Sequence, residues 1–493
     1  MRKRIVSKLA ERNTVLTPEA WEYLDRFDEP ISIVENVIEV DRNLPFPLGR
    51  DTLENFVEVK DEKEVEKTED NRDVKDKPDD DIPERRRPEP DDIKVLKDIS
   101  GESTCTGVID DFKEYFLDRY KRLRAIISKR REAKGISDID RVAKRSGNAK
   151  VIGMVGDIHN TANGNKMLTL EDPTGKIKAF ISSDSEAFDK NLLEDEVVLA
   201  EGQIWEKKDG YDTTFAVDDI IRPGIPKIKK MADKNFDGKI AFIGDIHVGS
   251  DTFLKDEWDR FTGWLNSDDE VAQDIRYLVI TGDLIDGIGI FPNQEEELEI
   301  IDIYEQYREL ARMLTDVPDD VLVITIPGNH DIVRNTEPQP KLPEDVRKLF
   351  PDNVVFYGNP CLLDIEGLKL LLYHGSSIND LSDLHPDVSN HKPITAMKEM
   401  MKRRHLVPVY GKKTSIAPED KDYLLIEDIP DVFVTGHIHR TEVEDYHGTI
   451  MINSSTWQSQ TEYQKMRDIE PDPAKVMVLD PTENQVSIQN FSS

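Results

Sequence analysis

The chain has almost no cysteine and no long apolar run. Its 493 residues include two cysteines, Cys105 and Cys361, and two cysteines cannot supply the disulfide framework of a small secreted protein. No segment approaches the roughly 20 consecutive apolar residues that a membrane-spanning helix needs. The first five residues are mostly basic and lack the apolar stretch of a secretory signal. Together these absences predict a cytoplasmic protein that contacts no membrane.

Positive charge is also scarce. The chain has 66 lysines and arginines against 100 aspartates and glutamates, which gives a net charge of −34. Basic surface normally drives nucleic-acid binding, so this balance counts against a polyanionic partner. The acidic residues need not lie near a substrate, however, because they can belong to disordered segments or suit a salt-rich cytoplasm, and bound metal ions invert the local field. The charge therefore does not exclude DNA as a substrate.

The chain is long enough for roughly two to four domains, and its composition changes sharply near the N-terminus. Residues 1–57 are predicted to form a small helical module, because Thr17 and Pro18 are typical of a helix start. Residues 58–98 are predicted to be a disordered, charged linker. Of its first 35 residues, 25 are charged and four are apolar, which is too few to offset the entropy of ordering. An exposed charged helix is the alternative.

Two smaller units follow the linker. Residues 99–148 are predicted to form a helical segment with an apolar stripe and a basic face, which either contacts phosphates or is simply solvated. Residues 149–226 are predicted to form a small Greek-key barrel of the OB type. Such a barrel binds single strands or docks a partner, and its few aromatic residues favour docking. The prediction is based on five short β-favouring runs with turn residues between them: 151–155, 167–170, 177–181, 197–200 and 215–217.

Residues 227–493 are predicted to form the largest domain. Near-continuous apolar strands alternate with helical segments there, which indicates buried α/β sheets. Five of the strands end in clusters of polar residues. These are Asp245 and His247 after strand 239–243, Asp283 after 277–280, Asn329, His330 and Asp331 after 321–326, His374 after 368–373, and His437 and His439 after 432–435.

The chemistry of these clusters indicates a metal site. Open α/β sheets gather ligands at the carboxyl ends of their strands, and adjacent glycines let the backbone turn there. Asp, Asn and His supply oxygen and imidazole ligands suited to Mn²⁺, Fe²⁺, Zn²⁺ or Mg²⁺. We also expect the Asp-x-His and His-x-His pairs to be extended, so that alternate side chains face one site.

One motif occurs twice in the sequence. Residues 156–159 repeat the Gly-Asp-Ile-His of residues 244–247, but they begin the predicted barrel, and no further cluster of ligand residues follows them there. We therefore interpret Asp157 and His159 as ordinary barrel residues. The specific signal is the full set of five clusters, each following a strand.

This set resembles the signature of the calcineurin-like metallophosphoesterases, which is D-x-H, G-D, G-N-H-D, H and G-H-x-H. The resemblance implies two mixed β-sheets flanked by helices and a centre of two divalent cations, with Mn²⁺ expected and Mg²⁺, Fe²⁺ and Zn²⁺ as alternatives. It implies that His330 contacts the phosphate or leaving oxygen and that Asp331 orients the His330 ring. The implied ligands are Asp245, His247, Asp283 and His439 for one metal and Asp283, Asn329, His374 and His437 for the other.

Longer stretches around the ligands resemble the small subunits of archaeal family D DNA polymerases. These stretches are residues 244–250 (GDIHVGS), 282–289 (GDLIDGIG) and 328–340 (GNHDIVRNTEPQP), and the order of the predicted domains matches as well. The resemblance implies a 3′→5′ exonuclease that proofreads at single-stranded or mismatched DNA 3′ ends. It also implies a heterodimer or larger assembly with the large polymerase subunit, association with the nucleoid, and the sliding clamp as a further candidate partner.

Two other functions compete with this prediction. The chain could be a catalytically silent scaffold of a replicative polymerase, although related scaffold subunits have lost metal ligands that this chain retains. It could also be a stand-alone phosphatase of small phosphoesters, which would not need the barrel or the linker. Lys402, Arg403 and Arg404 lie in a helical insertion between two ligand loops, where they are candidates for DNA contact or for an ordinary helix end.

Overall fold

The computed structural model describes residues 87–205, 213–226, 236–466 and 469–492, together with scattered positions between 5 and 48. In the N-terminal part, helix α2 (Pro18–Leu24) begins where the sequence predicted a helix. Buried side chains including Leu16, Trp21 and Leu24 pack together around it. Most of the predicted helical module and residues 58–86 of the predicted linker lie outside the described residues.

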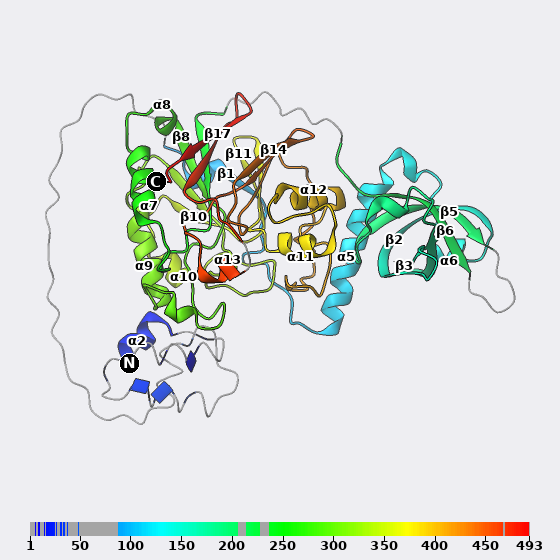
Figure 1. Ribbon diagram of the computed structural model, residues 1–493, viewed down its shortest axis with the longest axis horizontal. Helices are drawn as coiled ribbons and strands as arrows, with labels where there is room; N and C mark the ends of the chain where they lie inside the picture. The colour runs from blue at the N-terminus through cyan, green and yellow to red at the C-terminus, as the bar shows by residue number, and fades with distance from the viewer. Residues whose placement is uncertain are drawn as a thin grey trace.

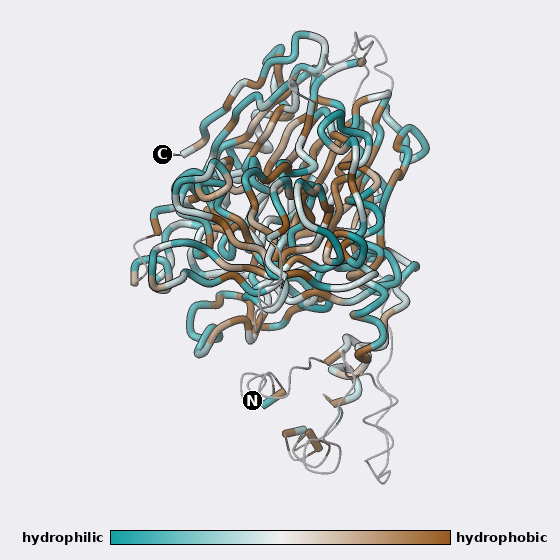
Figure 2. Tube along the Cα trace, turned by 90° about the vertical axis from the view of Figure 1, so that its right-hand side faces the viewer, coloured by the Kyte–Doolittle hydropathy of each residue, from teal (hydrophilic) through white to brown (hydrophobic). Residues whose placement is uncertain are grey.

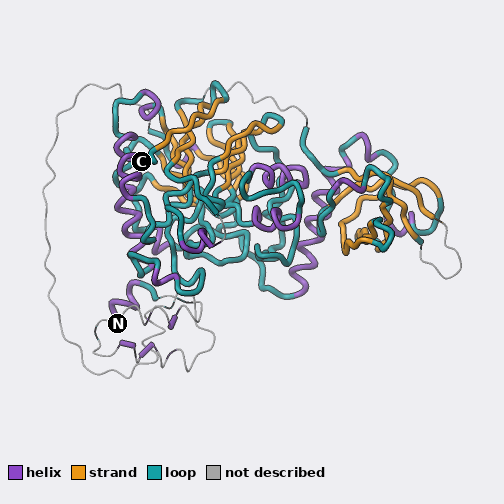
Figure 3. Tube along the Cα trace, in the orientation of Figure 1, coloured by secondary structure: helices purple, strands orange, loops and turns teal. Residues whose placement is uncertain are grey.

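Two six-stranded mixed sheets form the centre of the molecule (Figures 1 and 3). The first has the order β10-β9-β8-β7-β16-β17, and the second has the order β1-β11-β12-β13-β15-β14. The strands of the first are β7 (Lys239–Ile243), β8 (Ile275–Ile280), β9 (Leu322–Thr325), β10 (Val354–Phe356), β16 (Lys475–Asp480) and β17 (Gln485–Asn490); those of the second are β1 (Ile93–Lys97), β11 (Cys361–Ile365), β12 (Leu368–Leu372), β13 (Val432–Thr435), β14 (Glu442–Tyr446) and β15 (Thr449–Asn453).

Strand β1 corrects one predicted boundary. The linker was predicted to run to residue 98, yet Ile93–Lys97 pairs antiparallel with β11 and forms an edge of the second sheet. The segment is short and rich in lysine, so its own pattern does not distinguish a strand from a linker. Its partner strand, about 270 residues further along the chain, supplies the hydrogen bonds that make it a strand.

Helices cover the outer faces of the two sheets and leave an apolar layer between them (Figure 1). In β7, Ile240 and Phe242 point into the layer between the sheets, while Ala241 and Ile243 face the helices. The interior strands are therefore apolar on both faces, and Figure 2 shows hydrophobic segments running through the interior of the molecule. The flanking helices are α7 (Lys255–Leu265), α8 (Glu270–Gln273), α9 (Ile303–Leu314) and α10 (Glu344–Arg347) beside the first sheet, and α11 (Ser377–Leu384) and α12 (Ile394–Arg403) beside the second; α13 (Glu462–Met466) and the 3-10 turns η1 (Pro90–Asp92), η2 (Arg131–Ala133), η3 (Phe188–Lys190) and η4 (Gln294–Glu296) lie in connections.

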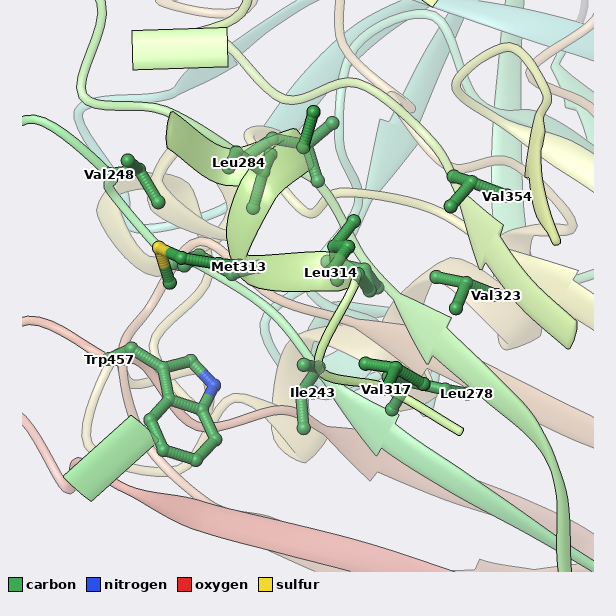
Figure 4. Close-up of a cluster of buried hydrophobic side chains, with 14 of the residues drawn as sticks. Ile243, Val248, Leu278, Leu284, Met313, Leu314, Val317, Val323, Val354 and Trp457 are labelled. Atoms are coloured by element: carbon green, nitrogen blue, oxygen red, sulfur yellow. The ribbon is translucent and has the colours of Figure 1, made fainter. Parts of the chain in front are cut away.

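Trp457 belongs to the core beneath the site. It is fully buried, and its ring lies 5.1 Å from those of both Trp258 and Phe261 on α7. Figure 4 shows Trp457 in the same apolar cluster as Ile243 and Leu278. Its backbone N–H donates to the carbonyl of Asp245 at 2.9 Å. The core thus fixes the position of the first ligand loop.

A closed five-stranded barrel lies at one end of the long axis (Figure 1). Its strand order is β2-β3-β4-β6-β5, and all five strands predicted from the sequence are present. The helix predicted within residues 99–148 is α5 (Ile109–Ser128), and it stands between the barrel and the two-sheet domain. The bounds here are β2 (Gly147–Asn160), β3 (Lys166–Asp172), β4 (Gly175–Ile181), β5 (Val197–Trp205), β6 (Thr214–Ile221) and the short α6 (Ile139–Val142).

Buried ion pairs join the barrel to the two-sheet domain. Arg403 at the end of α12 is 2% exposed and lies 3.2 Å from the carboxylate of Glu196, next to the barrel. It also pairs with Glu399 on its own helix. On α5, buried Arg119 pairs with Asp422 at 2.9 Å. Such pairs are directional and fully desolvated, so they fix how the two units sit against each other.

Candidate metal centre and active site

The carboxyl ends of strands from both sheets meet at one place. β7, β8 and β9 contribute ligand loops from the first sheet, and β12 and β13 contribute them from the second. Among the described residues, three overlapping groups bring their ligand atoms within 4.8 Å of one another. The groups are Asp245, His247 and His439; His247, Asp283 and His330; and Asp283, His374 and His437.

The backbone at these residues is not extended, so the expectation of alternating side chains on an extended segment was wrong. Asp245, His247, Asp283, His437 and His439 all have φ between 46° and 69°. This left-handed region is uncommon for residues other than glycine and has a conformational cost. The loops turn tightly because each must aim its side chain at a common centre directly after a strand ends.

Two glycines allow the ligand loops to approach closely. Gly282 has φ +94°, and a Cβ there would lie 2.7 Å from Nδ1 of His374. A Cβ on Gly328 would lie 2.2 Å from Oδ1 of Asp283. Both distances are too short for any side chain to fit without displacing a ligand. The glycines of the G-D and G-N-H-D motifs are therefore required by the packing of the site itself.

The first ligand group is formed by the loops after β7 and β13. The Nε2 atoms of His247 and His439 lie 3.1 Å apart, and Nε2 of His439 lies 3.6 Å from Oδ1 of Asp245. The backbone N–H of His437 donates to both carboxylate oxygens of Asp245, at 2.9 and 3.0 Å. Two ring nitrogens this close need a proton or a cation between them, which fits a metal site.

The second group adds the loops after β8, β9 and β12. Nε2 of His374 lies 3.0 Å from Oδ1 of Asn329 and 3.2 Å from Nδ1 of His437. Oδ2 of Asp283 lies 3.3 Å from Nε2 of His374 and 3.8 Å from Nε2 of His247. One oxygen of Asp283 therefore faces both groups, as the shared ligand of a two-cation centre would.

Burial and mutual attraction shift the protonation of these groups. Burial raises the pKa of Asp245 well above its ordinary value, and nearby Asp283 adds to this shift. Burial would also raise the pKa of Asp283, but His374 and His330 hold it well below the ordinary value. Burial opposes charge on His374, yet Asp283 raises its pKa to about 10. Burial lowers the pKa of His437 to about 3. Protons on this carboxylate–imidazole cluster thus take the place of positive charge that a cation would supply.

His330 and Asp331 lie at the site, but their predicted contact is absent. Nδ1 of His330 lies 2.7 Å from the backbone carbonyl of Asp286, so that carbonyl orients the ring. Asp331 instead accepts hydrogen bonds from the backbone of Gly328 (2.8 Å) and from the hydroxyl of Tyr307 (2.9 Å). Burial raises the pKa of Asp331 to about 7, and Asp283 adds to the shift. Asp331 holds the shape of the ligand loop and does not touch the His330 ring.

Sequence reasoning missed several residues that hold the ligands. Oδ1 of Asp286 contacts Nδ1 of His247 at 3.0 Å, and fully buried Gln294 donates to the other oxygen of Asp286 at 2.8 Å. Such outer contacts orient a metal-binding imidazole and increase its basicity. Asp286 lies three residues after Asp283 in the sequence, and this proximity to a ligand could have identified it. Gln294 had none, because it is brought back to the site by the 3-10 turn η4.

The site opens into a cleft of about 640 Å³. Besides the ligands, its lining includes Phe291, Asn379, His391, Lys413 and Arg440. Among the lining residues that the structure describes, two are lysine or arginine, Lys413 and Arg440, and five carry carboxylates. These carboxylates are Asp283, Asp286, Glu297, Asp383 and Glu470. The cleft has the volume of a small-ligand site, but its own charge opposes an anion.

The predicted DNA contacts are corrected for two of the three residues. Arg403 is engaged in the buried ion pairs described above. Arg404 is 6% exposed and donates to the carbonyls of Gly224 (2.7 Å) and Ile426 (3.0 Å). Neither guanidinium is available to a phosphate, because both join the barrel connection to the two-sheet domain. The ammonium of Lys402 is partly exposed and pairs with Glu399, so for Lys402 the DNA contact stays a prediction. The repeated motif at Asp157 and His159 lies exposed on β2, apart from the ligand groups.

Two mixed sheets with Asp, Asn and His side chains gathered at their strand ends define the protein as a metallophosphoesterase-like α/β protein. Residues 240–444 match the family model for the B subunit of DNA polymerases alpha and epsilon. The chain is 41% identical to the DNA polymerase II small subunit of Thermoplasma acidophilum over 78% of both chains. It is 41% identical to that of Archaeoglobus fulgidus over 79% of both chains, and 33% identical to that of Pyrococcus furiosus over 95% of this chain and 76% of the relative.

The chain therefore belongs to the family of archaeal DNA polymerase II small subunits, and the resemblance to polymerase small subunits is confirmed. No helix in the described ranges is long and apolar enough to cross a bilayer.

Proposed function

We propose that the cleft is the active site of a nuclease that removes nucleotides from DNA 3′ ends for a polymerase. The observation that supports this most is the pair of ligand groups that share Asp283 at the base of an open cleft. A catalytically silent scaffold has no physical need for buried groups of like charge or for ligand residues with left-handed backbone. Both features destabilise the fold unless the binding of a cation offsets their cost. In this arrangement both groups keep their ligand atoms converged.

The ligand set fits two divalent cations. Asp245, His247, Asp283 and His439 would hold one, and Asp283, Asn329, His374 and His437 would hold the other. The mixture of carboxylate, amide oxygen and imidazole is compatible with Mn²⁺, the ion expected from the sequence, and equally with Fe²⁺, Zn²⁺ and Mg²⁺. When bound, such a pair of cations lowers the pKa of a water and stabilises negative charge on a phosphoryl group.

Side chains of the protein supply the remaining catalytic functions. His330 is oriented by the Asp286 carbonyl at Nδ1, which leaves Nε2 for the substrate, and in its protonated form the ring can donate from Nε2 to a phosphate oxygen or to the leaving sugar oxygen. Asp331 and Tyr307 keep the loop of Asn329 and His330 in place. Asp286 holds His247. General acid catalysis from a positioned imidazole fits expulsion of an alkoxide.

The experiment that tests the nuclease is an assay of the full chain on single-stranded and 3′-mismatched DNA, with and without the large subunit. We expect mononucleotide release with Mn²⁺ and its loss in EDTA, with recovery when Mn²⁺ is restored. Metal analysis of the replete protein should give two ions per chain. One ion or none would contradict the two-cation centre, and metal-replete protein without nuclease activity in the complex would favour the scaffold.

We also propose that the large polymerase subunit docks where the barrel meets the two-sheet domain. Exposed apolar side chains gather there: Val108 and Ile109 are 53% and 87% exposed at the start of α5. Tyr410 is 41% exposed and packs against Phe112, with ring centroids 5.2 Å apart. Its backbone N–H donates to Asp195 beside the barrel at 2.8 Å. An apolar patch at the junction of two units is typical of an interface.

This surface can be tested by co-purification of the two subunits. We expect Ile109→Asp combined with Tyr410→Asp to weaken association with the large subunit by at least about tenfold, because both changes place charge in an apolar contact. Ile488→Asp, on exposed β17, is the matched control and should associate normally. Unchanged association in the double variant, or loss only when residues 1–57 are removed, would place the interface elsewhere.

A further inference from the structure

The basic face predicted within residues 99–148 divides into two parts in the folded protein. Each of three arginines on α5 pairs with a carboxylate: Arg119 with Asp422, Arg122 with Asp118 and Glu427, and Arg124 with Asp138. This part of the face is therefore used within the protein, where it joins the helix to its neighbours. The part that follows the end of α5 is different.

The segment from residue 129 to residue 150 is positively charged, unlike the chain as a whole. It has eight lysines and arginines against three aspartates and glutamates, in a chain with 66 against 100. The three carboxylates already have cationic neighbours: Glu132 lies 3.8 Å from Arg130, Asp138 lies 3.2 Å from Arg124, and Asp140 lies 2.8 Å from Lys144. Five exposed cations form no ion pair with the residues that the structure describes, and we call them the basic surface: Lys129, Arg131, Lys134, Arg141 and Arg145.

The basic surface is anchored to the fold. Three apolar side chains beneath it are buried in the barrel core or where α5 meets the barrel: Ala133, Ile139 and Val142. The ammonium of Lys150 donates to the carbonyl of Glu132 at 2.9 Å, and the backbone N–H of Ser137 donates to the carbonyl of Lys150 at 2.9 Å. These contacts fix turn η2 and the loop after it against strand β2. The cations therefore project from a surface of defined shape.

The chemistry of the basic surface favours the phosphates of duplex DNA. Lysine and arginine neutralise phosphates, and the release of counterions then drives binding without regard to sequence. A protein partner fits less well, because protein interfaces have an apolar centre and few lysines. None of the large apolar side chains that are exposed in the described chain lies within residues 129–150. Single strands are usually held by stacking on aromatic side chains, and this segment contains none.

The basic surface lies at the opposite end of α5 from the apolar patch proposed for the large subunit. Val108 and Ile109 stand at the start of the helix, and Lys129 caps its end. A helix of 20 residues is about 30 Å long. Neither surface therefore covers the other.

We propose that the basic surface binds the sugar-phosphate backbone of duplex DNA, outside the metal cleft. It gives an acidic chain a place to hold the double-stranded part of a substrate whose 3′ end enters the cleft. The inference rests on the proposed function for its choice of DNA as the partner. Binding at the basic surface does not require the metal ions, however, so the two proposals can be tested apart.

Fluorescence anisotropy of the full chain with a labelled DNA duplex tests the basic surface, in EDTA so that no phosphodiester is cleaved. The wild type is compared with the triple variant Arg131→Gln, Lys134→Gln and Arg145→Gln. With three phosphate contacts removed, the affinity should fall at least about tenfold at about 50 mM salt, and the slope of log K against log salt should become shallower by about 2–3. A single strand of the same length should bind the wild type more weakly than the duplex.

The matched control removes the same charge elsewhere in the chain. It is the triple variant Arg308→Gln, Arg312→Gln and Lys348→Gln, whose exposed side chains pair with carboxylates three or four residues before them in the chain. The control should keep the affinity and the salt slope of the wild type. Both triple variants should bind as many Mn²⁺ ions as the wild type, because neither changes the cleft.

The possible outcomes separate the basic surface from the nuclease. Equal affinity and slope in the wild type and in the triple variant of the basic surface would overturn the inference, as would a wild type that binds no duplex or prefers single strands. Loss of the large subunit from that variant, with DNA binding unchanged, would assign the surface to an acidic protein partner instead. A wild-type chain that binds duplex DNA in EDTA but releases no nucleotide with Mn²⁺ would leave the basic surface standing and remove the proposed nuclease.

Discussion

Asp283→Asn should lower nuclease activity by orders of magnitude and release metal while leaving the fold intact. The substitution keeps the side-chain shape, and the new amide oxygen can still accept from the backbone of His330, which now donates to Oδ1 of Asp283 at 2.9 Å. It removes the one carboxylate that faces both ligand groups. We expect at least one ion per chain to be lost and kcat to fall by about 10²–10³-fold or more, the range seen when a group that stabilises transition-state charge is removed.

The matched control for this change is Asp157→Asn. Asp157 stands in a Gly-Asp-Ile-His sequence identical to that of Asp245, yet it is exposed on barrel strand β2. It should keep both ions and full activity. Metal analysis, calorimetry and unfolding in urea separate the effects on binding and on stability. Retention of two tightly bound ions by Asp283→Asn would disprove its role as the shared ligand.

His330→Ala should lower kcat about 10²–10⁴-fold, the usual contribution of a general acid or base, with both ions still bound. The ring nitrogen nearest the backbone is held by the Asp286 carbonyl, so the other nitrogen is free to act on the substrate. Added imidazole should restore part of the activity, because the missing group is a proton donor in an open cleft. KM should change less than kcat, since the contact strengthens in the transition state.

His391→Ala is the control for His330, because His391 is an exposed histidine lining the same cleft. Its removal should change kcat less than about threefold, as for a surface side chain outside the chemistry. Wild-type activity in His330→Ala would remove its assignment. Loss of an ion from His330→Ala would instead make it a ligand, since His247, Asp283 and His330 also bring ligand atoms within 4.8 Å of one another.

The folded structure shows where the scarce basic residues of this acidic chain are used. Several basic residues that the sequence offered for DNA contact are used inside the molecule. Arg119 pairs with Asp422, Arg403 with Glu399, and Arg404 donates to backbone carbonyls. The cleft itself has more carboxylates than basic side chains. For the DNA substrate that we propose, we therefore expect bound cations and the large subunit to supply the positive field there.

The sequence by itself determined which ligand-type residues gather at the strand ends, and most of the elements. Each ligand cluster directly follows an apolar strand, and each barrel strand is a short run between turn residues, so both kinds of signal are local. Local signals can be recognised in a single sequence because strand propensity, turn chemistry and ligand type are properties of neighbouring residues. The family could be identified from the same clusters.

Only the tertiary structure decided how distant residues meet. β1 is a strand because β11 lies beside it, and Arg403 is buried because Glu196 approaches from the barrel side. The Asp286 carbonyl contacts the His330 ring in place of Asp331, because the loop after β9 places Asp331 against Tyr307. The ligand residues adopt left-handed backbone because several loops converge on one centre. Each outcome depends on a residue far away in the chain, and the local sequence does not indicate which residue that is.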